Sequence, residues 1–504
     1  MSGTIKLLAK DTAVYGISTI LGRFLNWALF PLYVKTLPPG EYGIVTDLYA
    51  FTALALVLLT YGMETGFFRF VSKEPDPARV YANSLRALGF TSGLFILLGL
   101  LFLEPFAALL RYPTMPHLVG MLIVIVGIDA FTAVPFAYLR YQRKAKTFAA
   151  IKIGYILLSI LLNLFFLVGC PLLVKWGAGG WIEWFYRPDW GVGYIFLSNL
   201  IANLVLLPVL LPFTRTARGR TDLRLIGHML AYSLPLMFMG IVGTFNQMAD
   251  KLLFRRLFED EGYALSELGI YAAGYKIAVV VMMSIQAFRY AYEPIVFKKD
   301  GSRSADGRTL YATAMHYFLL FEVVVYVGVL AYLDILKLLI APAYYPGLKV
   351  VPIIMAGEIL YGVYFNLSVW YKLTGKTLWG FWISLMGCTV TVAVIVLFAP
   401  RYSFLASAWA VLLSNLTMVV VCYLAGRRYY PVPYRLRRGL LYLILAGGVT
   451  ALLIWGQIHI KAVPLRLGLG TLLLLITVGV LIKSDKPLQT GLKALAQKVL
   501  KKVH

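Results

Sequence analysis

Three basic residues interrupt apolar runs that are otherwise long enough to cross a membrane. They are Arg23 in the first run, and Lys276 and Arg289 in the eighth. A charged side chain at the centre of a bilayer costs about 2.5–3.5 kcal/mol on insertion scales, so such residues normally face a cavity or a partner. Guanidinium and ammonium groups bind phosphates and carboxylates through charge-assisted hydrogen bonds. We therefore predict that Arg23, Lys276 and Arg289 bind an anionic substrate at membrane depth.

Acidic residues lie in or beside the same apolar runs, and they are candidates for gating or for coupling transport to an ion. Together with the lysine that follows Asp250, these candidates are Asp47, Glu64, Asp129, Asp250, Lys251 and Glu293. The alternative is that structural ion pairs neutralise each charge. This alternative predicts pairs of Arg23 with Asp47 or Asp250, and of Arg289 with Glu293 one helical turn away.

The residue patterns of common enzymes are missing from the sequence. The five histidines have no paired spacing for a metal ion, and the three cysteines are scattered in apolar runs. Gly375-Lys376-Thr377 ends like a phosphate loop, but Trp370 stands where that motif requires its first glycine. We therefore predict no metal, no cofactor, no ATP hydrolysis and no enzymatic activity for this chain.

The chain that positions these residues is too apolar for a soluble domain. It has 504 residues, of which 60% are hydrophobic and 14% are charged, whereas soluble domains have about 25% charged residues. Apolar runs of roughly 20 residues recur, each long enough to cross a hydrocarbon core of ~30 Å. They predict an all-α integral membrane protein with about 14 transmembrane helices, at 13–34, 45–68, 85–103, 117–139, 149–171, 192–212, 231–254, 268–292, 309–332, 350–371, 378–398, 404–425, 439–456 and 466–483.

Basic residues are distributed unevenly between the predicted loops. With a cytoplasmic N-terminus, every inside segment is basic, and the inside segments hold most of the 47 lysines and arginines. The positive-inside rule then places both termini in the cytoplasm. Topology and contact with anionic membrane lipids account for the net charge of +24, so we predict no nucleic-acid partner. The first run lacks a cleavage pattern and is predicted to be a retained helix.

A short pattern occurs twice, at an offset of 226 residues. Glu41-Tyr42-Gly43-Ile44 is followed by Tyr49, and Glu267-Leu268-Gly269-Ile270 is followed by Tyr275. Both copies stand where an outside loop runs into a helix, and six helices separate them. The pattern therefore predicts a parallel repeat, as in transporters whose halves are related by an axis along the membrane normal. The predicted parts are an N-lobe over 1–212, a C-lobe over 213–430, a helix pair over 431–483 and a basic cytoplasmic tail over 484–504.

Several longer motifs, in their order and spacing, resemble those of a known family. They are LPPGEYG at 37–43, GMETGFFR at 62–69, YSLP at 232–235, NQMADK at 246–251, GIYAAGYKIA at 269–278 and QAFRYAYEP at 286–294. On these motifs the chain resembles the polysaccharide transporters of the multidrug/oligosaccharidyl-lipid/polysaccharide exporter superfamily, in particular Wzx-type O-antigen flippases. The family often has Asp-Arg where this chain has Asp250-Lys251, which keeps the charge.

The resemblance implies two six-helix lobes around a central cavity that opens alternately to each side of the bacterial cytoplasmic membrane. It implies a substrate, an undecaprenyl-diphosphate-linked oligosaccharide, that moves from the inner to the outer leaflet. A polysaccharide polymerase and glycosyltransferases are then the implied partners. Arg23, Lys276 and Arg289 would line a cationic cavity for the diphosphate, which cannot cross hydrocarbon unpaired.

Two other functions stay open on the sequence alone. A lipid II flippase of the same superfamily also has fourteen helices and a cationic cavity. A multidrug cation antiporter would predict an acidic cavity, whereas the clearest charges within the apolar runs are basic. The sequence does not identify the sugar or the coupling ion.

Overall fold

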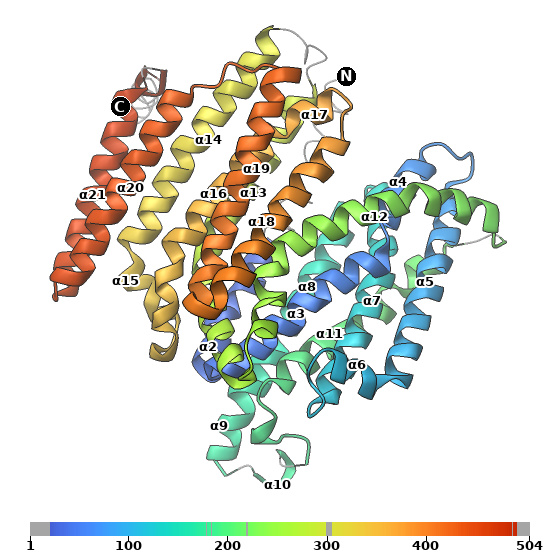
Figure 1. Cartoon of the computed structure of the whole chain (residues 1–504). Coiled ribbons are helices and arrows are strands. Elements are labelled where there is room, and N and C mark those ends of the chain that lie inside the picture. The colour runs from blue at the N-terminus through green and yellow to red at the C-terminus, as the bar shows by residue number, and fades with distance from the viewer. Residues whose placement is uncertain are drawn as a thin grey trace, which may run out of the picture. The chain divides into compact units, whose positions relative to one another are not determined.

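The fold consists of long helices packed side by side (Figure 1). The computed structural model describes residues 21–177, 179–182, 184–217, 220–298, 305–485 and 487–490, and every regular element in these ranges is helical. Thirteen helices within them are long and apolar enough to cross a membrane. The first predicted run begins outside these ranges, and its described part is helical from Leu21 to Ala28 and again over α2 (Phe30–Thr36). The predicted all-α membrane fold is confirmed.

The exposed surface of the helices carries many large apolar side chains, more than is usual for a protein in water. Phe90, Leu397 and Ile458 are about 70% exposed, at 71%, 70% and 71%. Exposed apolar patches on soluble proteins rarely exceed a few hundred Å², and here apolar side chains are exposed along helix after helix. Such a surface is stable only where lipid chains cover it.

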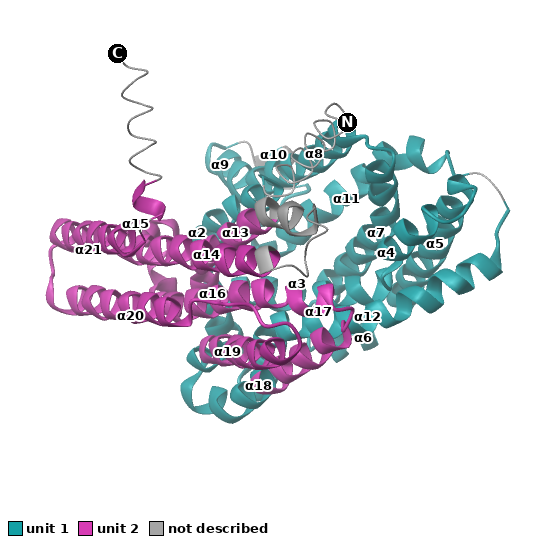
Figure 2. Ribbon diagram, turned by 90° about the horizontal axis from the view of Figure 1, so that it is seen from above, with its two compact units in different colours: residues 1–272, 391–407 teal, residues 273–390, 408–504 magenta. Residues whose placement is uncertain are grey.

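The chain divides into two compact units, which Figure 2 colours separately. The first unit comprises residues 1–272 and 391–407. Its helices are α2 (Phe30–Thr36), α3 (Pro39–Thr60), α4 (Met63–Val71), α5 (Pro77–Leu101), α6 (Leu103–Leu109), α7 (Pro116–Tyr141), α8 (Ala145–Leu164), α9 (Cys170–Lys175), α10 (Gly179–Ile182), α11 (Gly193–Thr214), α12 (Leu223–Leu252) and the start of α13 (Glu261–Lys298).

The second unit comprises residues 273–390 and 408–504. It contains the rest of α13 and most of the helices that follow, α18 and α19 being shared with the first unit. These helices are α14 (Ala305–Ala331), α15 (Leu333–Leu336), α16 (Val351–Leu367), α17 (Val369–Leu373), α18 (Leu378–Tyr402), α19 (Phe404–Tyr429), α20 (Leu436–His459) and α21 (Val463–Ser484). The predicted lobes and their boundaries stay a prediction, and most of the predicted tail lies outside the described residues.

One predicted span is broken in its middle. The run 45–68 was expected to be one helix, but α3 ends at Thr60 and α4 begins at Met63, because Tyr61 and Gly62 have left-handed backbone angles with φ of 36° and 71°. Gly62 tolerates this angle because it has no Cβ. A methyl group on Gly62 would also come within 2.9 Å of the carbonyl oxygen of Ser233, so the break lets α4 pack closely on α12.

Ion pairs fix the helix pair α20–α21 to the second unit at both ends. At one end Arg466 on α21 forms a bidentate pair with Asp334, with Nε–Oδ2 at 2.8 Å and Nη2–Oδ1 at 3.0 Å. At the other end Asp485 accepts a hydrogen bond from His316 on α14, with 2.6 Å between Nε2 and Oδ2, and Arg438 on α20 lies 3.5 Å away. The contacts bridge up to 169 residues of sequence, so they hold the tertiary position of the pair.

Both carboxylates have shifted pKa values. Burial acts to raise the pKa of Asp334, but the hydrogen bonds from Lys337 and Arg466 outweigh it and hold the pKa below its ordinary value. Burial also acts to raise the pKa of Asp485, and the backbone N–H of Leu488 together with His316 and Arg438 outweighs it in the same way. A carboxylate whose pKa is lowered by folding stabilises the fold above its unfolded pKa of about 4.

Acidification is therefore expected to loosen the helix pair. The stabilisation is complete above the unfolded pKa and is lost as the pH falls through the lowered pKa values of Asp334 and Asp485. Asp334→Asn and Asp485→Asn should each lower the stability by about 2 kcal/mol at neutral pH. Melting temperature measured against pH in detergent checks this. If the melting temperature of the double variant fell with decreasing pH as steeply as that of the wild type, the role of these carboxylates would be contradicted.

Candidate functional site

The two copies of the repeated pattern lie against each other in the first unit. A methyl group built on Gly43 of α3 would overlap the carbonyl oxygen of Leu265 on α13. A methyl group built on Gly269 of α13 would overlap the carbonyl oxygen of Pro39 and come within 3.0 Å of the amide nitrogen of Gly43. Gly43 and Gly269 differ by 226 residues, and so do Pro39 and Leu265. The crossing of α3 and α13 therefore follows the offset of the sequence repeat.

The glutamates of the two copies also occupy matching positions. The carboxylate of Glu41 lies against Gly191, just before α11 begins, where a methyl group would come within 2.6 Å of Glu41 Oε2. Glu267 accepts a hydrogen bond from the hydroxyl of Ser403, just before α19 begins. Each motif glutamate thus contacts a residue within two positions of the start of a later long helix.

Asp47 lies in an ion network beside this crossing. Its Oδ2 accepts hydrogen bonds from Tyr112 at 2.8 Å and from Nη1 of Arg255 at 3.3 Å. Arg255 also donates to Glu261 at 2.7 Å and to the carbonyl oxygen of Arg111 at 2.6 Å, and it is only 3% exposed. Burial and the adjacent Asp47 carboxylate raise the pKa of Tyr112, so the phenol stays protonated and donates.

Asp250 and Lys251 form a second buried pair. The ammonium group of Lys251 lies 2.7 Å from Oδ2 of Asp250, and the hydroxyl of Tyr271 donates to the same oxygen at 2.6 Å. The backbone carbonyl of Asp250 accepts a hydrogen bond from Ser407 at 3.2 Å. Asp47 and Asp250 were each expected as a possible partner of Arg23. Asp47 instead pairs with Arg255, which follows α12, and Asp250 pairs with the next residue, Lys251.

The remaining predicted charges of the first unit gather around Lys152 of α8. The charges of Arg140, Glu64, Arg23 and Asp129 all act electrostatically on its ammonium group. Arg140 pairs with Glu64 directly. We call these five residues the Lys152 cluster. It contains three cations, Arg23, Arg140 and Lys152, and two carboxylates, Glu64 and Asp129.

The helices around the cluster explain how it is assembled. A methyl group on Gly22 would come within 2.8 Å of Ile156 Cδ1, so the first helix lies close to α8 one turn from Lys152. Aromatic rings support the cations, since the Lys152 ammonium lies 5.7 Å from the ring centre of Phe148 and 5.8 Å from that of Phe136. Cation–π contacts of this kind hold a charge in place without neutralising it.

The predicted basic residues of the second unit have a different setting. The guanidinium of Arg289 lies 3.8 Å from the ring centre of Phe365, and the ammonium of Lys372 lies 4.6 Å from the same centre. Lys276 is exposed. The 13 residues from Lys276 to Arg289 make about 3.6 helical turns, so their side chains leave α13 on different sides. Glu293, the predicted partner of Arg289, has a side chain outside the described part of the chain.

The second unit also contains an apolar groove of about 500 Å³ between α14, α16, α19 and α20. We call it the apolar groove, and its walls include Leu319, Leu360, Leu416, Val420, Leu440 and Leu443. Branched aliphatic side chains line most of its length, and such a surface suits a lipid chain.

Sequence reasoning missed four basic residues that share these sites: Lys152, Arg140, Arg255 and Lys372. The first two were assigned to cytoplasmic segments because they stand near the ends of apolar runs. The position of Lys152 within the predicted span 149–171 could have identified it as a charge at membrane depth. Within the ranges that the structure describes, no group of three or more His, Cys, Asp or Glu residues is placed to hold a metal ion.

Comparisons with known proteins agree with this architecture. The chain is similar in structure to the "Lipid II flippase MurJ, inward closed conformation", with a TM-score of 0.70, 12% identity, and coverage of 94% of this chain and 99% of that chain. It is also similar to an inward-facing "multidrug resistance MATE family transporter of the MOP superfamily", with a TM-score of 0.62, 13% identity, and coverage of 81% and 94%. Likeness at these identities shows the fold alone.

The sequence comparisons give the family. A comparison with the curated proteins gives no match. Residues 8–298, more than half of the chain, match the family described as "Polysaccharide biosynthesis protein". The predicted kinship with polysaccharide transporters is thereby confirmed. The chain belongs to the polysaccharide biosynthesis protein family and has the fold of the MOP transporters.

Proposed function

We propose that this protein is a flippase for an undecaprenyl-diphosphate-linked oligosaccharide. It moves the lipid from the inner to the outer leaflet of the bacterial cytoplasmic membrane by alternating access, for cell-surface polysaccharide such as lipopolysaccharide O-antigen. A polysaccharide polymerase and glycosyltransferases are its expected partners. The observation that carries the proposal is the Lys152 cluster, in which three cations face two carboxylates beside the first helix.

The charge of the cluster suits the diphosphate. An unpaired ion cannot enter hydrocarbon, because the desolvation cost is far larger than a transporter can supply. Cationic side chains offset this cost with charge-assisted hydrogen bonds. Arg23 and Lys152 in the first unit, and Arg289 and Lys276 in the second, are the side chains that we assign to the diphosphate. Glu64, Asp129 and Glu293 are the acidic groups that we assign to ion coupling or gating.

The apolar groove suits the other end of the same lipid. A polyprenyl chain is a branched hydrocarbon, and burying it against branched aliphatic walls contributes roughly 25 cal/mol per Å². A groove of about 500 Å³ holds part of such a chain, while the rest stays in the bilayer. Each feature by itself fits one part of such a lipid: the Lys152 cluster fits the charged head, and the apolar groove fits the apolar tail.

A lipid II flippase is the second candidate, since lipid II has the same diphosphate and a polyprenyl tail. The helix pair α20–α21, which contributes Leu440 and Leu443 to the apolar groove, is compatible with either substrate. A multidrug cation antiporter is disfavoured because an excess of cations would repel a cationic drug.

Flipping in proteoliposomes separates these candidates. Fluorescent undecaprenyl-diphosphate oligosaccharide, fluorescent lipid II and a cationic dye are offered separately, and outer-leaflet label is quenched by dithionite. The oligosaccharide lipid should become accessible faster than in protein-free vesicles, and the other two should not. An imposed potential should change the rate, because moving one charge through 100 mV is worth about 2.3 kcal/mol.

The outcomes that contradict the proposal are equally direct. Faster flipping of lipid II would assign the chain to peptidoglycan precursors, and dye transport alone would assign it to drug export. Equal rates for all lipids with and without protein would show that the purified chain does not flip them.

A further inference from the structure

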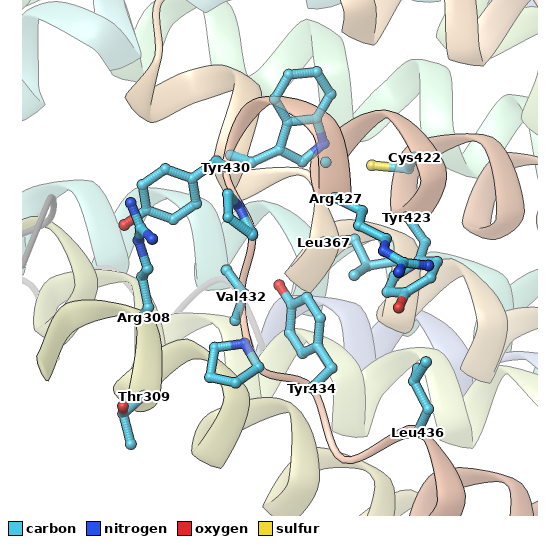
Figure 3. A pocket seen from close by; sticks show the side chains of 14 residues that line it. Arg308, Thr309, Leu367, Cys422, Tyr423, Arg427, Tyr430, Val432, Tyr434 and Leu436 are labelled. Carbon is cyan, nitrogen blue, oxygen red and sulfur yellow. The ribbon is translucent and has the colours of Figure 1, made fainter. Parts of the chain in front are cut away.

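A second pocket in the second unit is basic and aromatic, and it is separate from the predicted charges. It has a volume of about 830 Å³, within the range of ligand-binding pockets. Figure 3 shows its side chains, which come from the start of α14, from α16 and α17, from the end of α19 and from the extended segment 430–435 that leads into α20. We call it the head pocket.

The charges in the head pocket have one sign. Arg308 lies on one side and Arg427 on the other, with Tyr434 between them in the view of Figure 3. None of the described residues that line the pocket is acidic. Two arginines facing one space without a carboxylate repel each other, and an anion between them relieves that repulsion.

Arg308 has an unused donor. Its guanidinium stacks 5.0 Å from the ring centre of Tyr430, which fixes the plane of the group. Its Nε is buried but has no hydrogen-bond acceptor among the described residues. A buried donor without an acceptor costs about 1–3 kcal/mol, so native structures normally supply a partner. Phosphate and carboxylate oxygens are the acceptors whose geometry matches a planar guanidinium.

The head pocket continues into the apolar groove. Four residues line both spaces: Leu367, Tyr423, Tyr434 and Leu436. A soluble anion would use only the basic part, whereas a lipid with a phosphate head and a hydrocarbon chain would occupy both. The basic part lies at the helix ends that the distribution of lysine and arginine predicts to face the cytoplasm.

We propose that the head pocket binds the diphosphate of a polyprenyl-diphosphate lipid at the inner membrane surface, with the chain in the apolar groove. Arg308 and Arg427 hold the phosphate oxygens. Neither Arg289 nor Lys276 lines the site, and it serves as a loading site, where the lipid is captured before it is translocated. The role in loading rests on the proposed function, whereas recognition of the prenyl diphosphate does not.

Binding to the purified full-length chain in neutral phosphatidylcholine nanodiscs tests this proposal. The probe is radiolabelled geranylgeranyl diphosphate, which carries the diphosphate on a shorter prenyl chain. Unlabelled inorganic diphosphate and phosphatidylglycerol are the competitors. Arg308→Gln with Arg427→Gln should weaken binding of the probe at least about tenfold, and inorganic diphosphate should compete at least about tenfold less well than unlabelled probe.

Matched variants keep the test independent of folding and of transport. Arg428→Gln changes the neighbouring arginine, which does not line the pocket, and should leave binding unchanged. Arg308→Lys with Arg427→Lys keeps the charge and should restore part of the affinity, with a melting temperature equal to that of the Gln variant. Arg224→Gln changes an exposed arginine of the first unit, which lines neither the head pocket nor the apolar groove, and should leave both probe binding and flipping unchanged.

Three results would overturn the assignment. Unchanged probe binding in the double Gln variant would show that the arginines are not the site. Equal competition by phosphatidylglycerol would assign the pocket to a phospholipid, and equal competition by inorganic diphosphate would remove the role of the groove. A different result would contradict the proposed function but not the binding site. In that case the wild-type chain binds the probe through the two arginines but flips no lipid.

Discussion

Arg23→Ala and Arg289→Ala are each expected to slow flipping of the lipid-linked oligosaccharide at least about tenfold, which corresponds to about 1.4 kcal/mol per site. Arg23 belongs to the Lys152 cluster, where its loss leaves two cations against two carboxylates. Arg289 shares the ring of Phe365 with Lys372, and its loss halves the charge at that ring. In both cases the diphosphate loses a charge-assisted partner at a depth where water cannot replace it.

The measurement is the dithionite-quench rate in proteoliposomes that contain equal amounts of inserted protein. Arg224→Ala, an exposed arginine in the first turn of α12, is the matched control and should flip at the wild-type rate. Arg23→Lys and Arg289→Lys should retain part of the rate, because lysine keeps the charge but loses the bidentate geometry. Wild-type rates in both alanine variants would overturn the assignment of these arginines to the substrate.

Gly43→Ala and Gly269→Ala are expected to be strongly destabilising, although alanine is normally the better helix former. At each position the added methyl group would overlap a backbone carbonyl oxygen of the other helix. Backbone cannot rotate away as a side chain can, so α3 and α13 must separate. Overpacking of this kind costs typically 1–3 kcal/mol, and the loss of the Asp47 network beside it adds to that cost.

Gly93→Ala on α5 is the control with the opposite sign. A methyl group there meets no atom within 4 Å, so the substitution should stabilise the helix by up to about 1 kcal/mol. Melting temperatures in one detergent compare the three variants. Equal behaviour of the alanine substitutions at 43, 269 and 93 would show that the two helices do not cross as closely as described.

The sequence predicts the helices well because each must bury about 20 apolar residues in a bilayer, whatever else it contacts. Local breaks are harder, because Gly62 within an apolar run reads as an ordinary membrane glycine until its φ of 71° is known. The side chains that pair with each buried charge are the hardest feature to predict. Asp47 and Arg255 are 208 residues apart, and nothing in either local sequence pairs them.

The candidate site shows the same limit. Arg23 and the acidic residues Glu64 and Asp129 were identified from their position in apolar runs, yet the residue at the centre of their cluster was not. Lys152 was overlooked because a lysine near the end of a span is usually at the membrane surface. Four charges from three other helices act on it, and a linear sequence does not show which helices are neighbours.

The contacts at Gly43 and Gly269 have the reciprocity of a two-fold interface. In a symmetric homodimer, residue i of one subunit meets residue j of the other, and j meets i in return. Gly43 meets Leu265 and Gly269 meets Pro39, which is that reciprocity with 226 residues added to one partner. The crossing of α3 and α13 therefore has local two-fold pseudosymmetry, in which each motif glycine meets the backbone four residues before the glycine of the other copy.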